Sequence, residues 1–74
     1  MIIVDVPGTG RRIENYMEEQ NTSVKDIQKR LNLSVSYGVY KWLYGTSLPT
    51  IDHLVILADM FGVTMDDIIV TKRI

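Results

Sequence analysis

The chain has 74 residues, of which 46% are hydrophobic and 23% charged, and it contains one histidine and no cysteine. A chain of this size forms one small domain, and without cysteine it has neither disulfides nor thiolate metal sites. A lone histidine among scattered carboxylates predicts no metal or cofactor site. No apolar run approaches the roughly 20 residues of a membrane span, and no signal peptide is visible. We therefore expect a cytoplasmic protein without membrane association.

The charges are unevenly distributed, although the formal net charge is −1. Residues 11–49 hold six basic and four acidic side chains, whereas residues 50–74 hold two basic and four acidic ones. A contact with nucleic acid would therefore fall in the middle of the chain. The excess of positive charge is small, and a pI near 5.6 predicts weak nonspecific binding to a phosphate backbone.

The first residues are β-branched and end at the turn signal Pro7-Gly8, so residues 1–8 are expected to form an arm or a short strand. Thr9 is a candidate N-cap for a helix over residues 10–20. That helix carries apolar side chains at i, i+3 and i+4, the spacing of one helical face: Ile13, Tyr16 and Met17.

A second helix is expected to follow Ser23. The Ser23 hydroxyl can accept a hydrogen bond from the Asp26 N–H, and the Asp26 carboxylate can accept one from the Ser23 N–H. The apolar residues of this helix are Val24, Ile27 and Leu31. Asn32 comes next, where a chain leaving a helix often needs a left-handed residue. Residues 32–35 then leave room only for a tight turn.

A third helix is expected to start at Ser34 or Ser36 and to run to about Tyr44, where Gly45 ends it, with Val39 and Trp42 facing inward. A fourth helix follows Thr50 and stops at Gly62, with an apolar set of Ile51, Leu54, Leu57, Ala58 and Phe61. Thr64 caps a short fifth helix over residues 65–70, whose first turn holds Asp66 and Asp67, favoured there by the helix dipole.

These elements predict a compact all-α, five-helix domain over residues 9–70, followed by a tail at residues 71–74. The two ends, residues 1–6 and 68–74, are both rich in β-branched side chains. They could pair as a two-stranded sheet, within one chain or across a dimer, or remain disordered arms. The sequence does not decide between these alternatives.

Residues 23–45 have the helix, short turn and helix of a helix-turn-helix motif. The stretches SVKDIQ at 23–28, LNLS at 31–34 and VYKWLYG at 39–45, with Leu48-Pro49 and residues 51–69 behind them, resemble the lambda-repressor-like transcriptional regulators of the xenobiotic-response-element group. The resemblance covers residues 9–70, and its ordered set of spacings is a strong indication of fold.

The resemblance implies that residues 35–44 are a recognition helix in the major groove of double-stranded DNA. Carried over by position, the base contacts are Ser36, Tyr37, Tyr40 and Lys41. The corresponding phosphate contacts are Ser23, Lys25, Tyr44, Thr46 and Ser47. Because one small domain reads only a few base pairs, regulators of this kind usually act as homodimers on paired half-sites.

The chain departs from the family pattern at several positions. Val24 and Ser36 stand where the family often has Gln, and Leu43 stands where it usually has Glu. Gln28 replaces a common Ala where the two helices of the motif cross, which implies a shifted crossing or an amide satisfied nearby. The turn over residues 32–35 is also one residue longer than the common form.

Several residues have a structural reading as well as a functional one. Trp42 and Tyr16 fit the core better than a stacking platform, and the lone His53 fits a solvated position. Tyr37, Tyr40 and Tyr44 lie within eight residues on the face opposite the inward pair, which favours an interaction surface. The basic strip of Lys25, Lys29 and Arg30 is equally consistent with phosphate binding and with simple solvation.

No arrangement of residues predicts an enzyme or a small-molecule substrate. The segment from Gly8 to Gly10 lacks the third glycine of a phosphate-binding loop, and nothing brings Ser, His and Asp together. The sequence therefore predicts a sequence-specific DNA-binding transcriptional regulator. The alternative is a protein-interaction module of the same fold, antitoxin-like or anti-repressor, with weak or no DNA binding. Weak basicity and a tyrosine-rich third helix in which only Lys41 is charged favour this alternative.

Overall fold

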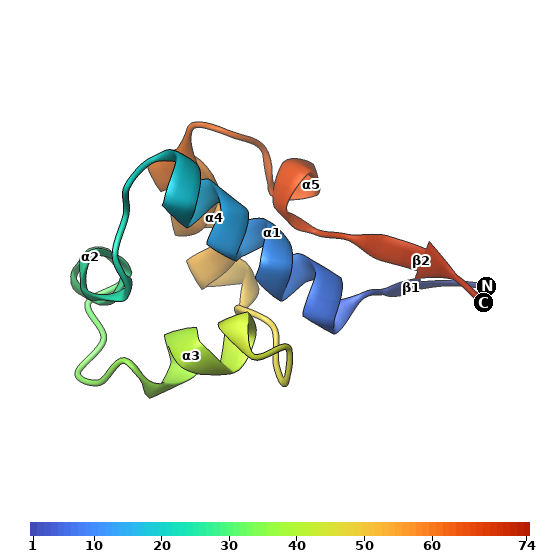
Figure 1. The fold of residues 1–74 in the computed structure, drawn as a ribbon, viewed down its shortest axis with the longest axis horizontal. Helices are drawn as coiled ribbons and strands as arrows, with labels where there is room; N and C mark the ends of the chain where they lie inside the picture. Colours follow the sequence, from blue (N-terminus) through green and yellow to red (C-terminus); the bar gives the residue numbers. More distant parts are fainter.

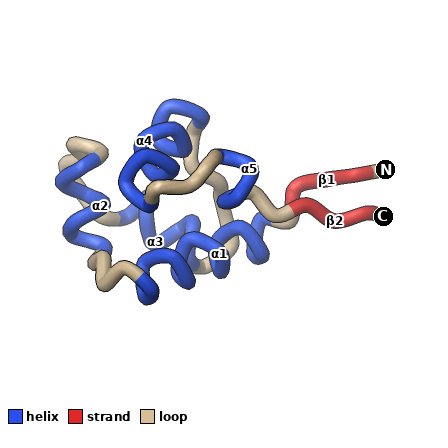
Figure 2. Tube along the Cα trace, turned by 90° about the horizontal axis from the view of Figure 1, so that it is seen from above, coloured by secondary structure: helices blue, strands red, loops and turns tan.

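The computed structural model describes all residues 1–74 as five helices and one two-stranded sheet (Figure 1). The elements in chain order are β1 (Ile2–Val4), α1 (Val6–Glu19), α2 (Val24–Arg30), α3 (Tyr37–Leu43), α4 (Ile51–Phe61), α5 (Met65–Ile68) and β2 (Thr71–Arg73). The helices form one body around α1, and the two strands project from it as a ribbon (Figures 1 and 2). The expected five-helix, all-α fold with short terminal strands is confirmed.

One apolar cluster holds the body together, and every helix contributes to it. Its members are Ile13, Met17, Ile27, Leu31, Val39, Trp42, Leu54, Leu57, Ala58, Phe61 and Ile68. The inward positions predicted for α2 and α3 are confirmed, because Ile27, Val39 and Trp42 are all buried. Burial of apolar side chains is the main favourable term in a domain that lacks disulfides and metal.

The first helix begins four residues earlier than the sequence predicts. Asp5 caps α1 by accepting a hydrogen bond from the Gly8 N–H at 2.9 Å. Pro7 fits inside the first turn because the N–H that it lacks has no helical partner there. The expected turn at Pro7-Gly8 and the expected cap at Thr9 are therefore wrong. Thr9 is instead buried, and its hydroxyl accepts the Val70 N–H at 3.0 Å.

The predicted helix ends are largely confirmed. Asn32 has a φ of 56° and Gly45 and Gly62 have φ of 77° and 71°, so all three adopt the left-handed conformation that ends a helix. In the turn after α2, the Gln28 amide donates to the Leu33 carbonyl at 3.3 Å. The larger side chain at the helix crossing is thus satisfied locally. The fifth helix ends at Ile68, two residues earlier than expected.

Two residues of α4 differ from expectation. Ile51, placed in the apolar set, is 75% exposed although it has the spacing of the buried stripe, because it is the first residue of the helix and lies at the end of that stripe. His53, expected in solvent, is half-buried with its ring 6.1 Å from that of Trp42. On α1, Tyr16 was expected in the core and is only half-buried, and its ring stacks on Phe61 of α4 with centroids 5.4 Å apart.

The two terminal strands pair antiparallel within one chain, in the register Ile2 to Arg73, Ile3 to Lys72 and Val4 to Thr71. This settles the alternatives for the two ends in favour of a sheet. The buried hydroxyl of Thr9 ties the base of the ribbon to α1 through its bond to Val70. Both chain ends therefore lie at the tip of the ribbon, away from α2 (Figure 1).

Candidate nucleic-acid interface

Helix α3 presents one buried and one open face. Val39 is fully buried and Trp42 is 5% exposed, and both pack against the core. The tyrosines on the other face remain open, with Tyr37 69%, Tyr40 41% and Tyr44 76% exposed. The inward pair thus fixes the direction of the outer face, as side chains three apart on a helix share one side.

The outer face of α3 is aromatic and carries one cation. The Lys41 ammonium lies 5.5 Å from the centre of the Tyr37 ring, a cation–π distance. The rings of Tyr40 and Tyr44 stack with centroids 6.1 Å apart. Together with Thr46 these four side chains line an open hollow. We call these five residues the tyrosine face. Lys41 lies in this face, and its ammonium group can donate to a phosphate or to a base acceptor.

One carbonyl accepts three of the hydrogen bonds that hold the turn after α3. The Lys41 carbonyl accepts the Thr46 N–H at 3.0 Å, the Thr46 hydroxyl at 3.1 Å and the Ser47 N–H at 3.3 Å. At Gly45 the chain passes so near α1 that a Cβ would lie 2.9 Å from the Cα of Pro7. This close approach fixes Thr46 and Ser47 beside the carboxyl end of α3.

The start of α2 is a complete capping box. The Ser23 hydroxyl accepts the Asp26 N–H at 3.1 Å, and the Asp26 carboxylate accepts the Ser23 N–H at 2.9 Å. These two hydrogen bonds hold the pKa of Asp26 below its ordinary value. The Ser23 hydroxyl still has its own proton to donate, and Lys25 beside it is exposed.

Two of the three basic residues of α2 have an acidic neighbour. Arg30 pairs with Asp59 of α4 at 3.0 Å, on the surface. Lys29 interacts with Asp26 and helps to lower its pKa. Only Lys25 therefore remains on this helix as a cation for which the structure gives no acidic neighbour.

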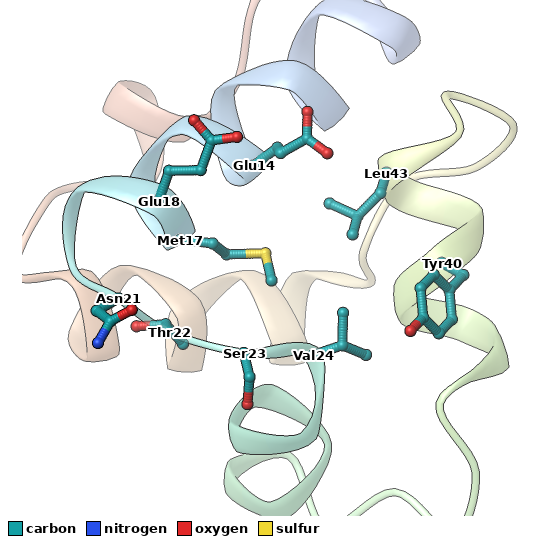
Figure 3. A pocket seen from close by; sticks show the side chains of 9 residues that line it. All are labelled: Glu14, Met17, Glu18, Asn21, Thr22, Ser23, Val24, Tyr40 and Leu43. Carbon is teal, nitrogen blue, oxygen red and sulfur yellow. The ribbon is translucent and has the colours of Figure 1, made fainter.

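A groove between α1, α2 and α3 lies next to the tyrosine face, with which it shares Tyr40 (Figure 3). Its apolar wall comes from Met17, Val24 and Leu43, and Glu14 and Glu18 border it from α1. Sequence analysis missed these two carboxylates. Their i, i+4 spacing placed them on one side of α1, but only the packing of the three helices brings them to a groove that Ser23 also lines.

The structure holds no group of three or more His, Asp or Glu side chains that could hold a metal ion. None of the helices is long and apolar enough to cross a membrane.

Helix α2 (Val24–Arg30) and α3 (Tyr37–Leu43) follow one another in the order of a helix-turn-helix, and the connection between them, residues 31–36, is longer than the tight turn expected over residues 32–35. A comparison with known families matches residues 13–68 to the family described as helix-turn-helix. The chain belongs to the helix-turn-helix family. The match covers three quarters of the chain and indicates a DNA-binding regulator of the helix-turn-helix type. Searches of curated proteins and of solved structures gave no significant match.

Within this helix-turn-helix domain the predicted contact residues fall into two sets. Tyr37, Tyr40 and Lys41 lie on α3, and Ser36 is its N-cap residue, with no side-chain cap bond of its own. The predicted phosphate contacts form the second set. Ser23 and Lys25 lie at the start of α2, and Tyr44, Thr46 and Ser47 lie at or just after the carboxyl end of α3. Their individual roles stay predictions.

Proposed function

We propose that this chain is a sequence-specific transcriptional regulator of the xenobiotic-response-element type that inserts α3 into the DNA major groove. The observation that carries the proposal is the tyrosine face. Three exposed tyrosines and Lys41 point away from the core on the second helix of a helix-turn-helix. In this motif the second helix reads base edges while the first crosses the backbone.

The side chains of this face can discriminate between bases. A tyrosine ring edge can pack on a thymine methyl, its hydroxyl can accept from or donate to a base edge, and Lys41 can donate to guanine O6 or N7. Ser36 has a hydroxyl that no cap bond engages. Because Tyr40 and Tyr44 are stacked on each other, they are held in place before DNA arrives, which lowers the cost of ordering them.

Phosphate binding relies on few charges. Among the proposed contact residues only Lys25 and Lys41 are cations, and the proposed phosphate contacts besides them are hydroxyls: Ser23, Tyr44, Thr46 and Ser47. Each neutralised phosphate contributes about −0.9 to the slope of log affinity against log salt. We therefore expect a slope of about −2 for one chain and about −4 for a homodimer on two half-sites.

The test starts from oligonucleotides selected for binding out of a random duplex pool. Affinity for the selected duplex, measured by fluorescence anisotropy over a salt series, should fall with salt at the slope given above. Lys41→Ala should weaken binding and reduce the slope by about 1 for each copy bound. Lys72→Ala is the matched control, because Lys72 is an exposed cation on the ribbon and should leave binding unchanged. An equal loss in both variants, or no enrichment from the pool, contradicts the proposal.

A protein-interaction module is the second candidate. Its specific support is the groove between α1, α2 and α3, which we call the acidic groove: Glu14 and Glu18 border it, and it shares Tyr40 with the tyrosine face. These carboxylates would repel phosphate. A module of this kind would bind random and selected duplexes weakly at every salt concentration. It would bind a protein partner through the same tyrosines instead, so Tyr44→Ala would abolish that binding.

A further inference from the structure

The ribbon formed by β1 and β2 is incomplete as a sheet. It has only two strands of three residues each, whereas a two-stranded sheet is marginal in water and three or more strands are usually needed. It also projects from the helical body, so that no helix covers its tip (Figures 1 and 2). Ile2 is 55% and Val4 38% exposed on β1. Both long edges of the ribbon are open.

The hydrogen bonds that close the ribbon show which backbone groups remain free. Met1 and Ile74 exchange bonds of 2.9 and 3.0 Å, and the Asp5 N–H donates to the Val70 carbonyl at 2.8 Å. Bonded pairs in an antiparallel ladder alternate with unbonded ones. The N–H and C=O groups of Ile2 and Val4 therefore point outward from β1, and those of Thr71 and Arg73 point outward from β2.

The two open edges differ in what a second, identical edge would meet. If each edge paired antiparallel with its own copy, the central residue would lie opposite itself on the symmetry axis, at the closer, unbonded spacing. On β2 that residue is Lys72, and two ammonium groups would face each other, which destabilises a strand pair. On β1 it is Ile3, and two branched apolar side chains would pack together.

We propose that β1 is the homodimer interface and that its occupant is β1 of a second copy of this chain. Ile2 of each copy lies opposite Val4 of the other, and the two bonded pairs exchange four main-chain hydrogen bonds. The result is a four-stranded antiparallel sheet with Ile3 on the two-fold axis. The pairing of β1 with β1 uses the same edge of both copies, so assembly stops at the dimer. Pairing β1 with β2 of another copy would leave one edge open at each step and would add further copies.

This arrangement places both copies of α3 on one side of the dimer. The strands overlap in Figure 1 and lie side by side in Figure 2, so Figure 1 looks along the plane of the ribbon, with α3 to one side of it. The two-fold axis of a continued sheet is roughly normal to that plane, and rotation about it keeps α3 on the same side. Two recognition helices facing the same way suit a two-fold DNA site, a consequence that rests on the proposed function.

The interface is small compared with the roughly 1,200–2,000 Å² of a standard complex, so a weak dimer is expected. Sedimentation equilibrium of the protein alone, over micromolar to millimolar concentrations, should show the mass rising from one chain towards two. Ile2→Pro removes the outward N–H of β1 and spares the bonds within the ribbon. Two intermolecular bonds are then lost, each worth about a factor of five, so the dissociation constant should rise roughly 30-fold.

Thr71→Pro is the matched control, because it removes an outward N–H from the other edge and should leave the mass profile unchanged. Helical circular dichroism shows whether each variant folds. In the wild-type protein the Ile2 and Val4 amides should also exchange more slowly as concentration rises, unlike those of Thr71 and Arg73. A monomer at all concentrations overturns the proposal, as do equal losses in both proline variants. Val55 is an exposed apolar residue on α4, and a dimer lost on Val55→Lys but retained in Ile2→Pro would also overturn it. No DNA is present, so these results stand apart from the test of DNA binding.

Discussion

Replacing Gly10 by Ala tests how closely α1 approaches α3. Within a helix this change normally stabilises by about 1 kcal/mol. Here the new Cβ would lie 3.2 Å from the Trp42 carbonyl carbon, 3.6 Å from the Leu43 Cα and well inside contact with the Trp42 carbonyl oxygen. These are backbone atoms of α3, so relief requires moving that helix and not merely a side chain.

The clash should exceed the gain in helix propensity. Overpacking costs typically about 1–3 kcal/mol, and a backbone obstacle places this site at the upper end. We therefore expect Gly10→Ala to lower the free energy of unfolding by about 1–2 kcal/mol, and the melting temperature by roughly 5–15 °C. Thermal unfolding followed by circular dichroism measures both.

Gly38→Ala provides a control of opposite sign. Gly38 also lies within a helix, but a Cβ added there meets no atom within 4 Å. The propensity gain is then unopposed, and the melting temperature should rise by about 4 °C. If Gly10→Ala melts at or above the wild-type temperature, the close approach of α1 to α3 is refuted.

Three further predictions concern charges and caps. Glu18→Gln should raise affinity for the selected duplex about two-fold at low salt, measured by anisotropy. Glu19 lies outside the groove, so Glu19→Gln should change the affinity less. An equal effect of both variants would mean that only net charge matters. Ser23→Ala removes the cap of α2 and should lower the free energy of unfolding, measured in urea, by about 1 kcal/mol. An unchanged urea midpoint would show that the capping box does not stabilise the fold. Hydrogen bonds from Ser23 and Thr64 lower the pKa values of Asp26 and Asp67 in the fold, so the unfolded chain binds more protons and stability should fall as pH drops below about 4; urea midpoints that stay constant from pH 5 to pH 3 would contradict this.

The elements that the sequence predicted well are those whose signals are local. Ser23 with Asp26 defines the start of α2 within four residues, and Asn32 and Gly62 mark helix ends by their own backbone preferences. The open face of α3 was also predictable, because the spacing of Val39 and Trp42 is enough to fix which side is buried.

The features that sequence analysis missed depend on contacts between distant segments. Thr9 was interpreted as a cap because a hydroxyl before a helix usually is one, but its partner Val70 lies 61 residues away. The acidic groove appears only when α1, α2 and α3 are packed together, and the pairing of Arg30 with Asp59 links two helices. In each case the deciding contact joins segments that are far apart in the sequence, and local preferences do not encode such contacts.

The hydrogen bonds between Met1 and Ile74 have a consequence for engineering. Since the two ends already touch, a short peptide could join them into a ring with little distortion. Such cyclisation would restrict the unfolded chain and leave α3 unaltered, with a stabilisation of order 4 kcal/mol from the loop-closure relation. A urea titration of the cyclic product against the linear chain would measure that gain.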